Sequence, residues 1–83
     1  MREVFCRVCG WSDGGVRWEN GVGSFDICDC CGCEAGYEDV TPEAARGHRE
    51  RWLAEGTPWF DRRARPDGWE WRDQLDRVPE AFH

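Results

Sequence analysis

The residues with the clearest chemical signature are two cysteine pairs of the same form. They lie in Cys6–Gly10 and Cys28–Gly32, each with two residues between the cysteines and a glycine directly after the second. This spacing lets one tight turn direct both sulfurs at one ion, and the glycine relieves the steric cost of that turn. Two such turns make a closed tetrahedral cage of four sulfurs, which structural zinc prefers. We therefore predict one structural Zn²⁺ held by Cys6, Cys9, Cys28 and Cys31.

A third cysteine pair leaves the choice of ligands open. Cys30 and Cys33 have the same spacing and interleave with the second pair. We favour Cys28 and Cys31, because Gly32 then repeats the form of the first pair, whereas Glu34 follows Cys33. Cys30 and Cys33 are then spare thiols.

Three alternatives to a zinc site are an iron site, three disulfides and a redox-active cysteine pair. Iron accepts the same four thiolates, and spacing alone does not distinguish it from zinc. Three disulfides would require an oxidising compartment. A thioredoxin-like redox pair would require a βαβ unit, which a chain of 83 residues with this layout does not offer.

No catalytic constellation is evident. Four thiolates fill the metal shell and leave no open position for a reacting water. His48 is expected to pack on the apolar face of a helix, and His83 is the last residue. We therefore expect a protein that is not an enzyme.

Charge and length constrain the partners. The chain has 17 acidic residues and 11 basic ones, all arginine, for a formal charge of −6, and a zinc with four thiolates adds −2. Such a field repels a phosphate backbone, so we expect no nucleic acid. An acidic surface suits a protein partner with a basic surface. A chain this short also needs a stabilising device such as a metal.

The expected compartment is the cytoplasm. No apolar run follows the basic start, so no secretory leader is predicted. No stretch has the roughly 20 apolar residues that span a membrane. Clustered cysteines in a reducing compartment are typical of metal sites.

We predict a small metal-stabilised α+β domain over residues 1–83. Residues 1–40 are expected to form a zinc ribbon of short antiparallel strands. Residues 41–78 should form a helical part packed on it, and 79–83 a loose tail. Strands are expected at 4–5, on both sides of a turn at 13–15, and at 24–27, with a further turn at Asn20-Gly21.

The first helix has clear ends. Thr41 is a good N-cap, Pro42 fits the first helical position, and Gly56 fits the residue after the helix, which predicts a helix over about 42–55. A second short helix is expected at about 71–77.

Helical spacing predicts two faces for the first helix. Ala45, His48 and Trp52 share an apolar face, with Leu53 at its edge. The opposite face is expected to be solvated: Arg46, Arg49, Glu50 and Glu55.

Two further groups could recognise a partner but more simply serve the fold. An acidic group near the second cysteine pair is expected to be a solvated loop: Asp26, Asp29, Glu34, Glu38 and Asp39. Most of an aromatic group should pack the helices on the ribbon: Trp52, Trp59, Phe60, Trp69 and Trp71.

Several segments also resemble a known family: Cys6–Gly10, Ser24–Gly32, Gly36–Asp39, Arg49–Phe60 and Gly68–Leu75. The chain is similar to the bacterial cysteine-rich proteins named for a Cys-Pro-Cys-Cys motif, the CPCC-type proteins, over about residues 5–78. Here Asp29 stands where that family has proline, and Cys33 where it often has an aromatic residue. The resemblance implies a zinc ribbon of uncharacterised function, with an immunity role against a toxin suggested for some relatives.

The sequence therefore favours a protein-binding module with a structural Zn(Cys)₄ site. A sharper version is an acidic immunity-type inhibitor of a toxin. The alternatives are a rubredoxin-like electron carrier and a nucleic-acid-binding zinc ribbon. The oligomeric state is left open.

Overall fold

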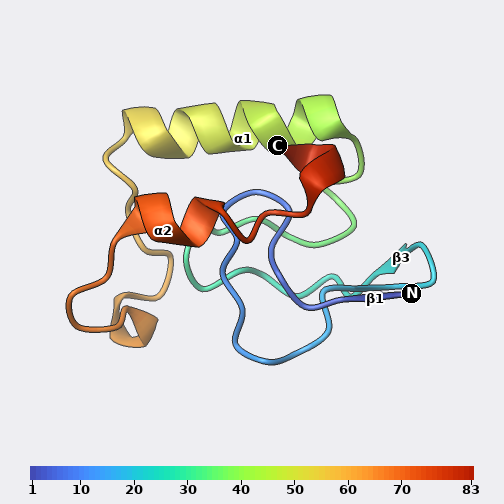
Figure 1. Cartoon of the computed structure of the whole chain (residues 1–83), viewed down its shortest axis with the longest axis horizontal. Helices are drawn as coiled ribbons and strands as arrows, with labels where there is room; N and C mark the ends of the chain where they lie inside the picture. Colours follow the sequence, from blue (N-terminus) through green and yellow to red (C-terminus); the bar gives the residue numbers. More distant parts are fainter.

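The computed structural model describes all residues 1–83 and has an α+β architecture (Figure 1). Three two-residue strands form one antiparallel sheet in the order β1-β2-β3. Glu3 of β1 faces Trp18, and Trp18 faces Gly23 of β3. The elements are β1 (Arg2–Glu3), β2 (Trp18–Glu19), β3 (Val22–Gly23), α1 (Pro42–Ala54), the 3₁₀ turn η1 (Arg62–Ala64), α2 (Trp71–Leu75) and the 3₁₀ turn η2 (Glu80–Phe82).

The sheet is smaller than predicted: no strand forms just before the turn at 13–15 or at 24–27, and the strand after that turn begins only at Trp18. The Asn20-Gly21 turn is confirmed: both residues have positive φ, as the tight turn of a two-residue hairpin requires. The strand predicted at 4–5 lies instead at Arg2–Glu3. The strand predicted at 24–27 is wrong, because Phe25 has a φ of +64° and only Ile27 forms a bridge, to Glu34. A positive φ interrupts the extended backbone that a strand needs.

The predicted ends of α1 are confirmed. The Thr41 side chain accepts a hydrogen bond from the backbone N–H of Ala44 at 3.1 Å. At the other end Gly56 has a φ of +91° and donates to the carbonyl of Leu53, while Thr57 donates to the carbonyl of Trp52. This pair of bonds closes the helix as a Schellman motif.

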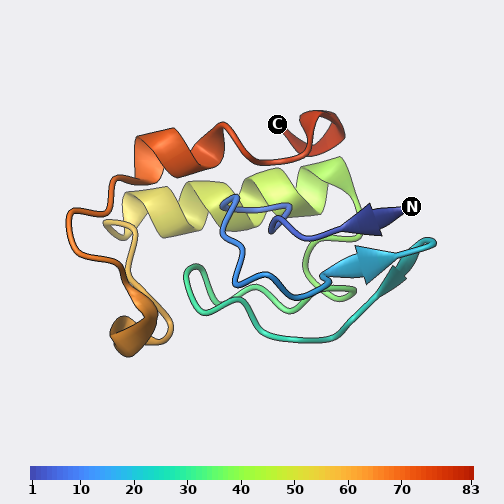
Figure 2. The ribbon, with the colours of Figure 1, turned by 60° about the horizontal axis from the view of Figure 1, so that its bottom comes forward.

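The core joins α1 to the cysteine-bearing loops, and α1 runs along one side of them (Figure 2). Ala45 and Trp52 of α1 are buried in the same cluster as Cys6, Cys9 and Val8. The apolar face of α1 is therefore confirmed.

One prediction for the opposite face of α1 is wrong. Arg49 is half-buried instead of solvated, and its guanidinium donates to the backbone carbonyls of Val8 (2.6 Å), Arg7 (3.0 Å) and Phe82 (2.6 Å). Helical spacing could not show this, because the acceptors come from distant parts of the chain.

The last residues also pack more closely than a loose tail would. Residues 80–82 form η2, which lies against α1. The Phe82 ring lies 4.1 Å from the Arg7 guanidinium, and His83 Nε2 lies 2.6 Å from the Val78 carbonyl.

The second helix is shorter than predicted and buries an unexpected residue. α2 ends at Leu75 instead of 77, and its buried side chain is the polar Gln74. Trp71 and Leu75 are half-buried, and Val78 beyond the helix is buried. None of the helices has the length and apolarity needed to cross a membrane.

The aromatic residues mainly fill the core, as predicted. Trp59 makes edge-to-face contacts with Trp11 and Trp69, at centroid distances of 4.9 and 5.1 Å, and Trp52 meets Trp69 at 6.2 Å. Phe60 is the exception and is largely exposed.

Candidate metal centre

The two cysteine turns have the same backbone hydrogen bonds. Gly10 donates to the Cys6 carbonyl, and Gly32 donates to the Cys28 carbonyl, both at 2.9 Å. The N–H groups of Cys6 and Cys28 each donate to the carbonyl five residues further on, both at 2.8 Å. Both glycines have a φ near +80°, which a side chain would disfavour. We call these turns the first knuckle (6–11) and the second knuckle (28–33).

The knuckles bring together the four cysteines that the spacing selects. The sulfurs of Cys6, Cys9, Cys28 and Cys31 all lie within 4.8 Å of one another. Cys6 and Cys31 are 3.7 Å apart at Sγ, and Cys9 and Cys28 are 3.6 Å apart. A disulfide needs about 2.05 Å, so these are four separate thiols. The cluster could hold a metal ion.

The remaining two cysteines lie outside this group of four. Cys30 is fully buried, and its Sγ receives the Gln74 side-chain amide at 3.4 Å. Cys33 is fully buried, and its thiol lies 3.8 Å from the Glu34 carbonyl.

The electrostatics of the cluster favour a cation. Hydrogen bonds from neighbouring thiols, that of Cys28 first, lower the pKa of Cys6 well below its usual range. Burial raises the pKa of Cys9 and of Cys31 well above theirs. One thiolate is therefore stabilised, whereas each further one is costly unless a positive charge joins the cluster.

Arg17 supplies one such charge, a role that was not predicted from the sequence. Its buried guanidinium donates to the carbonyls of Asp26 (3.0 Å) and Cys33 (3.2 Å) and lies 3.9 Å from Cys6 Sγ. Burial disfavours its charge, but the thiols of Cys6 and Cys28 outweigh burial and raise the pKa of Arg17. No local pattern distinguishes this arginine from the other ten.

Gln74 was missed for the same reason. Its side-chain amide donates to the Cys9 carbonyl at 3.0 Å, across 65 residues of sequence, and accepts the Trp69 indole N–H at 2.7 Å. Gln74 and Arg49 thus tie the first knuckle to the helical part.

The histidines lie outside the group of four sulfurs. The His48 ring contacts the Cys31 carbonyl through Nε2 at 3.1 Å and the Glu38 carboxylate through Nδ1 at 3.2 Å. It joins α1 to the second knuckle through the backbone.

The acidic group near the second knuckle is not the uniform solvated loop that was expected. Asp39 is fully buried, accepting the Trp18 indole N–H at 3.0 Å and the Gly36 N–H at 2.8 Å. Asp26 is exposed and Asp29 half-buried.

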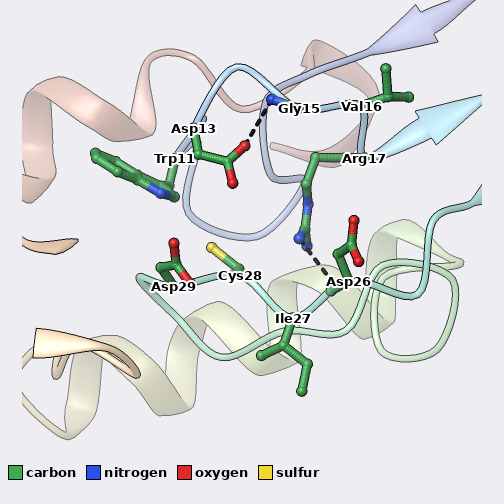
Figure 3. Close-up of a pocket in the computed structure, with 9 residues that line it drawn as sticks. All are labelled: Trp11, Asp13, Gly15, Val16, Arg17, Asp26, Ile27, Cys28 and Asp29. Atoms are coloured by element: carbon green, nitrogen blue, oxygen red, sulfur yellow. Dashed lines mark hydrogen bonds between the residues drawn. The ribbon is translucent and has the colours of Figure 1, made fainter. Parts of the chain in front are cut away.

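A cavity of about 350 Å³ lies beside Cys28, between residues 11–17 and 26–29. Figure 3 shows the carboxylates of Asp13 and Asp29 on opposite sides of it, with Trp11 at one end. Asp26 and Arg17 complete its polar lining. Three aspartates thus line a cavity that reaches one cysteine of the cluster, Cys28.

Comparison with known proteins gives no assignment: the chain matches no protein-family model, and no curated protein or solved structure has significant similarity to it. The resemblance to the CPCC-type proteins therefore stays a prediction from sequence.

Proposed function

We propose that the chain is a non-enzymatic zinc ribbon with one structural Zn²⁺ on Cys6, Cys9, Cys28 and Cys31, and that it binds a protein with a basic surface. The spacing of the sulfurs supports the metal site. A Zn–S bond of about 2.3 Å in tetrahedral geometry implies sulfurs about 3.8 Å apart. Two of the six sulfur pairs, at 3.6 and 3.7 Å, are close to that value, and all six lie within 4.8 Å.

The surroundings favour a structural metal over a catalytic one. Four sulfurs complete a tetrahedral shell, and Cys6, Cys9 and Cys28 are buried. Binding at such a site contributes about 10–16 kcal/mol near neutral pH, more than a core of this size supplies.

Metal analysis tests this part of the proposal. The full chain would be purified without added metal and studied by elemental analysis and native mass spectrometry. One zinc per chain with two free thiols left over is the expected result. Iron would indicate the rubredoxin-like electron carrier instead, and a metal-free chain six protons light would mean three disulfides.

The cavity beside Cys28 supports the basic partner. Its three aspartates lie next to a cluster that carries −2 when zinc is bound, and Arg17 is already engaged by backbone carbonyls. A lysine or arginine of a partner could pair with these aspartates and contact the Trp11 ring in the same cavity. The sharper version is an immunity-type inhibitor whose acidic face covers the basic active site of a toxin.

A pull-down with products of neighbouring genes tests the partner. The triple variant Asp13→Asn, Asp26→Asn, Asp29→Asn should lose a basic partner that the wild type retains. Asp67→Asn is the matched control, because Asp67 is exposed and does not line the cavity. If no basic protein is retained, or if the triple variant retains it equally, the binding proposal fails while the metal site stands.

A further inference from the structure

A second cavity lies in the loop between α1 and α2, and its chemistry is opposite to that of the first. This loop projects from the end of the molecule opposite the three-stranded sheet (Figures 1 and 2). The cavity has a volume of about 320 Å³ and is lined by residues 56–58 with Trp59, Arg62, Arg65 and Trp69. Pockets for small molecules begin at about 300 Å³, so one small ligand would fill it.

The lining of this cavity is basic, although the chain as a whole is acidic. No aspartate or glutamate lines it. The side chains of Arg62 and Arg65 form no hydrogen bond or ion pair within the chain, whereas Arg63 between them pairs with Asp61 at 3.3 Å. Two unneutralised guanidiniums at one cavity predict an anionic ligand.

The other walls are aromatic. Trp59 and Trp69 meet at 76° with their ring centroids 5.1 Å apart. Arg65 lies over the Trp69 ring at 5.6 Å, and Trp69 is half-buried. Trp59 is only 8% exposed, and its indole N–H has no hydrogen-bond partner. The cavity thus combines a partly exposed aromatic surface with the two arginines.

We propose that this cavity binds a nucleoside monophosphate, with the phosphate at Arg62 and Arg65 and the base against the indole of Trp69. The planar guanidinium presents paired donors that match phosphate oxygens. An indole is a platform on which any nucleobase can stack. A simple inorganic anion would use the arginines but leave the aromatic walls without a partner.

Charge favours a mononucleotide over a nucleic-acid strand. Residues 56–69 contain three arginines and two aspartates, while the whole chain carries −6. A longer strand would extend from this basic loop over an acidic surface that repels its phosphates. The proposed ligand is therefore a single nucleotide, and its site is separate from both the thiol cluster and the acidic cavity proposed for the protein partner.

Calorimetric titration of the full, metal-loaded chain with adenosine monophosphate at low salt tests the inference. Inorganic phosphate and uncharged adenosine serve as comparison ligands. The nucleotide should bind at least about tenfold more tightly than either, because only it uses both walls. In a ¹H–¹⁵N spectrum the indole N–H signals of Trp59 and Trp69 should shift on titration. That of Trp18, which is bonded to Asp39, should not.

Variants in the same loop give a matched control. The double variant Arg62→Gln, Arg65→Gln should weaken nucleotide binding at least about tenfold, through loss of two charge-assisted contacts. Arg63→Gln should change it less than about twofold, because Arg63 is 92% exposed and does not line the cavity. Metal content and far-UV spectra would show that each variant is folded. Equal binding of phosphate and nucleotide, absence of binding at millimolar concentration, or equal loss in the Arg63 variant would each overturn the inference.

Discussion

The two knuckles have the same local structure but different support. Side chains of the helical part hold the first: Arg49 binds the carbonyls of Arg7 and Val8, and Gln74 binds that of Cys9. Side chains also contact the second, at the Cys30 sulfur and at the Cys31 and Cys33 carbonyls. Unlike the first, it has two backbone donors from another segment as well, since the N–H groups of Phe60 and Asp61 donate to the carbonyls of Cys30 and Asp29.

This difference has a consequence for mutation. A backbone donor survives most substitutions, whereas a side-chain donor is lost with its residue. The first knuckle should therefore be the more sensitive one, although both supply two sulfurs to the same cluster.

The largest effect is expected from removing one sulfur of the first knuckle. Cys9→Ser breaks the closed shell and forfeits much of the roughly 10–16 kcal/mol that metal binding supplies. The N-terminal half should be unfolded in this variant, which far-UV circular dichroism and a melting curve would show. An unchanged spectrum and melting temperature would refute a structural metal.

The next largest effect comes from a methyl group at each knuckle glycine. A Cβ at Gly10 would lie 2.2 Å from the backbone oxygen of Gln74, but at Gly32 it would meet only the Phe60 side chain, at 3.2 Å. Both variants incur the left-handed strain of about 1–2 kcal/mol, and overpacking adds about 1–3 kcal/mol at Gly10 alone.

The comparison is made by denaturant unfolding of the metal-loaded variants. The free energy of unfolding should fall by about 2–5 kcal/mol in Gly10→Ala and by about 1–2 kcal/mol in Gly32→Ala. Equal losses of unfolding free energy would mean that α2 shifts to accommodate the methyl group and does not stabilise the first knuckle.

The knuckles can also be compared by removing one side chain that binds a backbone carbonyl of each. Gln74→Met keeps the side-chain length but leaves the Cys9 carbonyl and the Trp69 indole N–H without their partner, and it also removes the weaker contact to the Cys30 sulfur of the second knuckle. This should cost about 2–3 kcal/mol of unfolding free energy. His48→Gln removes a ring whose polar contacts are the Cys31 carbonyl and the Glu38 carboxylate. It should lower the free energy of unfolding by about 1 kcal/mol. A larger loss for the histidine variant would reverse the proposed order of support.

The smallest effect on the metal is expected from the spare thiols. Cys33→Ala removes a sulfur that lies outside the group of four, so metal stoichiometry should stay at one per chain, with a stability loss of about 1–2 kcal/mol for the small cavity. Native mass spectrometry of this variant beside Cys31→Ala gives the contrast. Loss of metal from the Cys33 variant but not from the Cys31 variant would transfer the ligand role to Cys33.

The sequence by itself determined the features that depend on a few neighbouring residues. The form of each knuckle follows from Cys-x-x-Cys-Gly, and the ends of α1 follow from Thr41, Pro42 and Gly56. Such features are predictable because their hydrogen bonds close within about six residues.

Tertiary structure decided which polar side chains serve the cluster and where extended chain becomes a strand. No local sequence pattern identifies Arg17, Arg49 and Gln74, because the carbonyls that accept their hydrogen bonds lie 9 to 65 residues away in the chain. The stretch 24–27 alternates as a strand does, yet packing sets Phe25 at a positive φ, with its ring against Gly36. Contacts between distant segments depend on how the whole chain packs, so no short pattern encodes them.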